Sequence, residues 1–165
     1  MRIVLDYSGI QDNGALALLA RSVLEAVVEH NRYLLNLARK EGVGIPPLFE
    51  SGVRFRNEPW AGVGLARAVG DARAPALEEF AHLGIVMGRG WGDCAQLCAW
   101  RVAECREGWP IGKPPSDASF RIYCRPFEEN RSRLYHVQTR HAPRPRFEND
   151  PKAGTIEDTS RLLDY

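Results

Sequence analysis

The N-terminal quarter of the chain carries one long helical pattern. Residues 2–6 fit a short strand, and Asp12 or Asn13 can cap a helix that ends near Glu41, because Gly42 follows. These start and stop signals predict a helix of about eight turns, which is long for a globular protein.

The apolar positions of this helix recur every three, four or seven residues, and charged residues occupy much of the remaining surface. They are Leu16, Leu19, Ala20, Val23, Val27, Leu34, Leu37 and Ala38. His30 and Asn31 interrupt the stripe. The pattern predicts a helix that lies across the protein core, and a helix that binds a partner protein is the alternative.

The middle of the chain predicts a loop followed by two helices. Residues 43–72 are rich in Gly and Pro and favour a long loop, whereas residues 75–87 fit a short helix with Leu77, Phe80, Ala81 and Gly84 on one side. A further helix begins at Cys94. We expect its stripe of Cys94, Cys98, Val102 and Cys105 to face the core, with Arg101, Glu104 and Arg106 solvated at its edges.

The last third of the chain changes from a helical to an alternating period. Residues 108–117 predict a loop, and residues 120–125 alternate apolar with polar side chains as a half-buried strand does. A second strand at 134–141 should pair with it as an antiparallel hairpin. After a polar loop at 142–153, residues 154–163 predict a short strand and a final turn. The expected fold class is therefore α+β.

Length and composition limit the number of domains and the kinds of partner that we expect. The 165 residues suit one domain, with residues 1–44 forming the N-terminal strand and helix and residues 45–165 forming the core. The net charge is +1 with no basic run, so neither nucleic acid nor a membrane surface is an expected partner. The first residues lack the layout of a signal peptide, and no apolar run is long enough to span a bilayer.

The candidate chemistry centres on Cys94, which follows Gly90, Trp91, Gly92 and Asp93 at the start of a helix. The first-turn N–H groups of a helix carry partial positive charge, which favours the nucleophilic thiolate form of cysteine. The glycines allow a sharp turn and close approach of another chain. The alternative is that Cys94 is a small buried apolar residue.

His136 in the second strand and Asp158 after the last strand complete a possible Cys-His-Asp set. Such a set needs a thiolate to attack an acyl carbon, an imidazole to move a proton and a carboxylate to orient the imidazole. Alternatively, His136 bonds only to backbone and Asp158 only caps the final turn. We expect His30, His82 and His141 to lie away from this site, and Cys94 alone among the cysteines to lie at a helix start beside an imidazole.

A metal site or a cofactor is not expected. Three of the four cysteines, Cys94, Cys98 and Cys105, lie on one helix, and Cys124 lies on a strand. There is no Cys-x-x-Cys pair, so the ligand spacing typical of structural zinc is missing. The same layout is unlike a secreted disulfide framework and favours a reducing compartment.

Three phrases taken together resemble transglutaminase-like proteins of the papain-like cysteine protease superfamily, above all small ones encoded by tailed bacteriophages and prophages. They are Gly-Trp-Gly-Asp-Cys at 90–94, Leu-Tyr-His-Val at 134–137 and Thr-Ile-Glu-Asp at 155–158, within a likeness that covers residues 45–165. The resemblance implies Cys94 as nucleophile, His136 as base and Asp158 as orienting acid, on a helix packed against a small antiparallel sheet. The N–H groups of Cys94 and Trp91, or a side chain from 82–89, are candidates for the oxyanion hole. Three positions differ from the usual pattern of the resembled proteins: Ala95 and Gln96 stand where two acidic residues are usual, and Thr159 stands where proline is common.

The resemblance implies a virion-associated protein of the tail, neck or baseplate, made in the host cytoplasm and in contact with other virion proteins. Its site would cleave or transfer amide or isopeptide bonds through a thioester, on a peptide, a Gln side chain or a cell-wall peptide. A structural virion protein with a vestigial site and a cell-wall peptide amidohydrolase are the alternatives.

Overall fold

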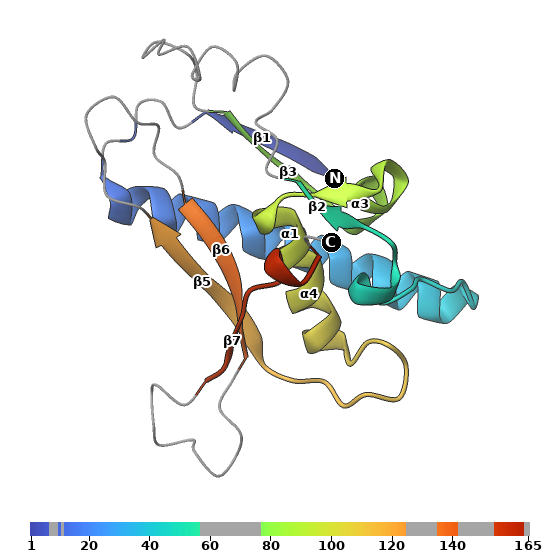
Figure 1. The fold of residues 1–165 in the computed structure, drawn as a ribbon. Coiled ribbons are helices and arrows are strands. Elements are labelled where there is room, and N and C mark those ends of the chain that lie inside the picture. Colours follow the sequence, from blue (N-terminus) through green and yellow to red (C-terminus); the bar gives the residue numbers. More distant parts are fainter. Residues whose placement is uncertain (7–9, 11, 57–76, 125–134, 142–153, 164–165) are drawn as a thin grey trace.

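The computed structural model describes residues 1–6, 10, 12–56, 77–124, 135–141 and 154–163, which form a mixed helix and sheet fold (Figure 1). The helices are α1 (Asn13–Glu41), α3 (Leu83–Arg89) and α4 (Cys94–Glu107), with short 3-10 turns η1 (Leu48–Glu50) and η3 (Arg161–Leu163). The strands are β1 (Arg2–Asp6), β2 (Arg54–Phe55), β3 (Leu77–Ala81), β4 (Trp91–Gly92), β5 (Ala118–Cys124), β6 (Tyr135–His141) and β7 (Ile156–Glu157). The α+β class is confirmed.

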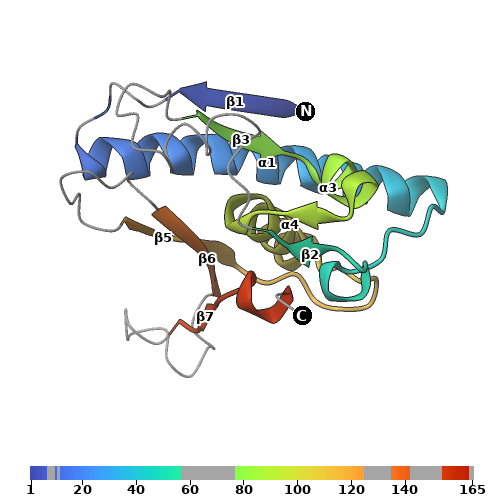
Figure 2. The ribbon, with the colours of Figure 1, turned by 45° about the horizontal axis from the view of Figure 1, so that its top comes forward.

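The strands form three small sheets around the helices. β1 pairs antiparallel with β3, β2 pairs parallel with β4, and β5, β6 and β7 form an antiparallel sheet in that order. The expected hairpin is therefore present, with Phe120 opposite Thr139 and Tyr123 opposite His136. Figure 2 shows α1 running between the β1–β3 pair on one side and the three-stranded sheet on the other.

The boundaries of α1 follow the signals in the sequence. The side chain of Asp12 accepts a hydrogen bond from the Ala15 N–H, and Gly42 ends the helix in the left-handed conformation with φ 67°. The predicted stripe is only partly correct. Leu16, Ala20, Val27 and Ala38 are buried, but Leu37 is exposed, and the core face also includes Leu24, Val28, Asn31 and Leu35. The long helix thus buries its apolar face within its own chain.

The predicted helix at 75–87 is wrong in its first half. Residues 77–81 form β3, which pairs along its length with β1, and only Leu83–Arg89 are helical. His82 separates the two elements, because its ring accepts a hydrogen bond from the Gly84 N–H and caps α3. The predicted loop at 43–72 contains η1 and β2; its residues 57–72, like the loop at 142–153, lie outside the described residues.

Helix α4 is the centre of the core. Ten of its fourteen residues are buried, which makes it a helix enclosed on nearly all sides rather than one with a single apolar face. The expectation that Glu104 is solvated is wrong: its side chain is 1% exposed, and it accepts hydrogen bonds from the Leu48 N–H and the Arg101 guanidinium. Burial raises the pKa of Glu104 to about 7, against the effect of these two donors.

The outer edge of β5 is capped by arginines. Arg21 of α1 donates to the Phe120 carbonyl and Arg106 of α4 donates to the Ala118 carbonyl, each at 2.9 Å. These guanidiniums occupy carbonyls that would otherwise be open to pairing with another strand. Within the described part of the chain, no helix has the length and apolar character needed to cross a membrane.

A candidate thiol site at the start of helix α4

Cys94 is the first residue of α4, as the sequence predicts. Asp93 caps the helix: its side chain accepts from the Gln96 N–H, while the Gln96 side chain accepts from the Asp93 N–H, which completes a capping box. Gly90 takes φ 75° and ends α3, so the turn before Cys94 requires it. Gly92 has a different role, because a Cβ there would lie 3.0 Å from Leu97 and 3.1 Å from Val86.

A buried polar network holds the first turn of α4 in place. The Gln96 amide donates to the Glu79 carbonyl at 2.8 Å, and the Arg89 guanidinium donates to both the Gln96 side chain and the Glu79 carboxylate. Arg89 also stacks on Trp91, 3.8 Å from the ring centroid. Burial raises the pKa of Asp93 to about 6, against the N–H donors and Arg89. Cys94 therefore begins on a rigid backbone.

His136 and Asp158 are brought together, as predicted. The His136 Nε2 atom lies 3.1 Å from both carboxylate oxygens of Asp158. Gln138 and Ser160 donate to the same carboxylate, at 3.1 and 2.7 Å. Burial acts to raise the pKa of Asp158, but the hydrogen bonds from Ser160, Gln138 and His136 outweigh it and hold the pKa below its ordinary value. Asp158 is thus a carboxylate shared by several donors, not only a cap of the final turn.

The position of Cys94 relative to His136 follows from how α4 lies along β6. The Cys98 thiol donates to the Val137 carbonyl at 3.1 Å, and the Cys105 sulfur lies 3.8 Å from His141 Nδ1, so helix and strand run in the same direction. Cys94 is one turn before Cys98, which corresponds to about 6 Å of helix or about two residues of strand. It is therefore level with the start of β6, where His136 is the second residue.

The two faces of β6 carry different groups. Successive strand side chains point to opposite faces, so His136 and Gln138 share one face with Asp158, whereas Val137 and Thr139 point to the other face. Both Val137 and Thr139 are fully buried. Helix α4 packs against β6, whereas His136 points to the face opposite the buried Val137. A contact between the Cys94 sulfur and the His136 ring would therefore have to form at the N-terminal end of β6. This pairing, and the Cys94 and Trp91 N–H groups as oxyanion donors, stay predictions.

A second set of thiol, imidazole and carboxylate was missed by the sequence analysis. Besides the Cys105 contact, His141 places Nε2 3.2 Å from Glu157 Oε2, and Glu157 accepts from Arg101 at 3.0 Å. Cys105 is therefore also beside an imidazole, although it lies near the end of α4 and not at its start. Strand alternation places His141 on the opposite face from His136, because they are five residues apart, and Glu157 on the opposite face from Asp158. The numbering does not say which of these faces meets α4.

The helix ends distinguish the two thiols. Cys94 lies at the positive end of α4, whereas Cys105 lies in its last turn. The hydrogen bond between His141 and Cys105, followed by the one that His141 donates to Glu157, raises the pKa of His141 to about 9. Cys98 is fully enclosed, and burial raises its pKa to about 12, which makes it unreactive. The role of Cys94 as the nucleophile stays a prediction.

The other candidate groups lie elsewhere. His30 and His82 contact each other with ring centroids 5.0 Å apart, near the N-terminal amine, and His141 lies at the opposite end of β6 from His136. Among the residues described by the structure, no three His, Cys, Asp or Glu side chains gather as a metal site would require. Comparisons with protein-family models, with curated proteins and with solved structures found no match.

Proposed function

We propose that this chain is a cysteine-dependent acyl-transfer domain with a transglutaminase-like, papain-like arrangement. Cys94 is the nucleophile, His136 the base and Asp158 the orienting acid. The observation that carries the proposal is the bond between His136 Nε2 and Asp158, because it leaves Nδ1 as the ring nitrogen that exchanges a proton with a thiol. The capped start of α4 supports the role of Cys94.

The reaction follows from these positions. The Cys94 thiolate attacks the carbonyl carbon of an amide, the C–N bond breaks, and the His136 imidazolium gives its proton to the departing nitrogen. The products are an amine or ammonia and a thioester on Cys94. Water or a second amine then attacks the thioester, with His136 accepting its proton, and frees the thiol. No cofactor enters these steps.

The proposed setting is a bacteriophage particle, where the acyl donor is a Gln side chain, an isopeptide or a peptide bond in a virion protein or cell-wall peptide. The likeness of residues 45–165 to phage-encoded proteins supports this setting. The burial of Leu16, Val27 and Leu35 within the chain supports a self-contained enzyme, since a helix kept for docking would leave that stripe for a partner. A purely structural virion role with a vestigial site is the competing proposal.

The test begins with thiol reactivity. Iodoacetamide should label Cys94 before Cys98, Cys105 and Cys124 near neutral pH, because among the cysteines Cys94 alone lies at the positive end of a helix. Mass spectrometry of the labelled peptides gives the order. Faster labelling of Cys105 would exclude Cys94 as the activated thiol.

Turnover is measured next as release of ammonia or amine from a Gln-containing peptide and from a cell-wall peptide. Cys94→Ala should abolish turnover, whereas Cys105→Ala, the matched control on the same helix, should keep it. Turnover that survives Cys94→Ala would contradict the proposed site. A well-folded chain that labels at Cys94 but turns over neither substrate would support the structural role.

A further inference from the structure

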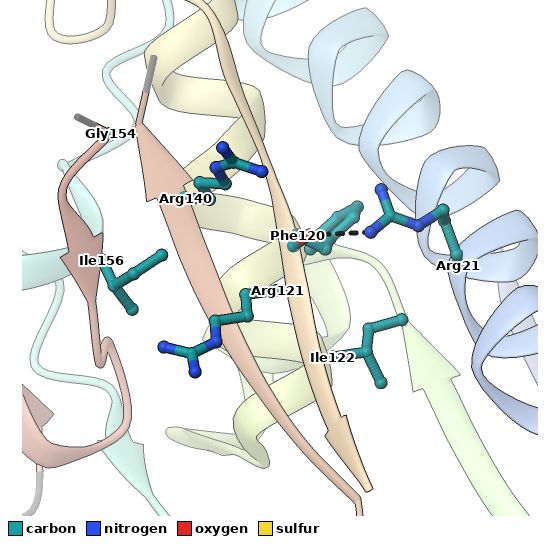
Figure 3. A pocket seen from close by; sticks show the side chains of 7 residues that line it. All are labelled: Arg21, Phe120, Arg121, Ile122, Arg140, Gly154 and Ile156. Carbon is teal, nitrogen blue, oxygen red and sulfur yellow. Dashed lines mark hydrogen bonds between the residues drawn. The ribbon is translucent and has the colours of Figure 1, made fainter. Parts of the chain in front are cut away.

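A groove of about 480 Å³ is lined by residues of α1, β5, β6 and β7 (Figure 3). Arginines from three elements line it: Arg21 from α1, Arg121 from β5 and Arg140 from β6. Ile156, opposite Arg140 across β6 and β7, supplies an apolar wall, and Gly154 leads into β7. Phe120 and Ile122 also line the groove, although both belong to the hydrophobic core. The proposed reaction uses none of these residues.

The charge of the groove differs from that of the chain. The whole sequence is nearly balanced, with 22 basic and 21 acidic residues, yet the described residues lining this groove include three guanidiniums and no carboxylate. All three arginine side chains are exposed to solvent. Three positive charges in one concave site attract an anionic ligand at close range.

Contacts with backbone atoms and strand pairing fix the residues that line the groove. Arg21 is fixed by its bond to the Phe120 carbonyl, drawn as the dashed line in Figure 3. Gly154 packs so closely that a Cβ there would lie 2.6 Å from the His141 carbonyl and 3.5 Å from Arg140 Nε. Arg140 and Ile156 are opposite each other across β6 and β7, and Arg121 is opposite Gln138 across β5 and β6. The arginines thus extend from ordered strands and a capped helix.

We propose that this groove binds an acidic peptide segment, with glutamate or aspartate carboxylates on the arginines and side-chain methylenes against Ile156. A guanidinium matches a carboxylate with two parallel hydrogen bonds, and the isoleucine suits the apolar stems of a peptide. A nucleic-acid strand fits less well, because it needs a longer basic track and exposed aromatic faces. Phe120 is 2% exposed and offers no such face. The inference does not depend on the acyl-transfer reaction.

The experiment measures binding without turnover. A fluorescent peptide with several Glu residues is titrated with the protein, alongside a peptide in which each Glu is Gln. The Glu peptide should bind more tightly, and Arg121→Gln and Arg140→Gln should each weaken it roughly tenfold. Arg54→Gln is the matched control, since Arg54 is an exposed arginine on β2 in another sheet and its loss changes the net charge equally.

Three results would overturn the proposal. An equal loss of affinity in Arg54→Gln would show that the peptide is attracted to the overall charge of the protein and not to the groove. If the Gln peptide binds as tightly as the Glu peptide, the groove does not recognise carboxylates. A single-stranded oligonucleotide that binds more tightly than the Glu peptide, and loses that binding in Arg121→Gln, would assign the groove to nucleic acid. Circular dichroism checks each variant, and Arg121→Gln decides alone if Arg140→Gln misfolds.

Discussion

At the scale of single residues, Gln96 shows how a difference from the resembled family is explained by local structure. The proteins that the sequence resembles usually carry acidic residues after the cysteine, but in this chain position 96 both accepts and donates hydrogen bonds. Gln96 accepts from the Asp93 N–H and from Arg89, and it donates to the buried Glu79 carbonyl. Only an amide meets all three demands.

Gln96→Glu should therefore destabilise the protein. An ionised carboxylate cannot donate to the Glu79 carbonyl, so we expect a loss of about 1–3 kcal/mol in the free energy of unfolding near neutral pH. The loss should shrink in acid, where a protonated Glu can donate. Urea unfolding at pH 7 and pH 4 measures both values. Gln96→Glu equal in stability to the parent at pH 7 would show that this hydrogen bond contributes little.

At the scale of elements, boundaries were predictable wherever a local signal sets them. Asp12 and Gly42 bound α1, Asp93 and Gly108 bound α4, and the alternation around Phe120 predicted the hairpin. Each signal acts within a few residues, because caps satisfy end groups and alternation reflects one buried face. The contact between His136 and Asp158 was expected only from the resemblance, and the structure shows the two side chains 3.1 Å apart.

Features that depend on distant segments were not predictable. β3 is a strand because it pairs with β1, more than seventy residues earlier, and its apolar spacing alone also fits a helix. Glu104 is buried because the Leu48 N–H and Arg101 reach it. The contact of Cys105 with His141 likewise requires knowing which face of β6 meets α4. In each case the deciding partner lies far away in sequence.

Asn31 provides a test at this scale, because it joins two helices. It is fully buried in α1, and its side-chain oxygen accepts from the Leu83 N–H at the start of α3, at 2.8 Å. Asn31→Ala leaves that donor without its partner and should lower the free energy of unfolding by about 1–3 kcal/mol. Asn36→Ala, an exposed position on the same helix, should change it by about 0.5 kcal/mol or less. Equal effects in thermal unfolding would contradict the role of Asn31.

At the scale of the whole molecule, several shifted groups set the dependence of stability on pH. Burial, followed by repulsion from the N-terminal amine and His30, lowers the pKa of His82 to about 4, whereas burial raises the pKa of Asp93 to about 6. Between roughly pH 4 and 6.5, deprotonation of His82 favours folding and deprotonation of Asp93 opposes it, so these two groups largely cancel. The pKa of Glu104 is raised to about 7, so its deprotonation lowers the free energy of unfolding as the pH rises to 7.

Above pH 6.5 the balance is set by His141. Its folded pKa of about 9 exceeds the ordinary value of 6.5, so its stabilising effect is complete below pH 6.5 and is lost as the pH rises through 9. The groups that face it are Cys105, Glu157 and Arg101; Glu157 is already ionised in this range, since its pKa is lowered. We expect the free energy of unfolding to fall from pH 6.5 to 9, by at most about 3 kcal/mol from His141. Urea unfolding across this range should show the decrease in the parent and a flatter profile in His141→Gln. A parent whose stability stays level or rises from pH 6.5 to 9 would show that the imidazolium does not hold Cys105 and Glu157 together.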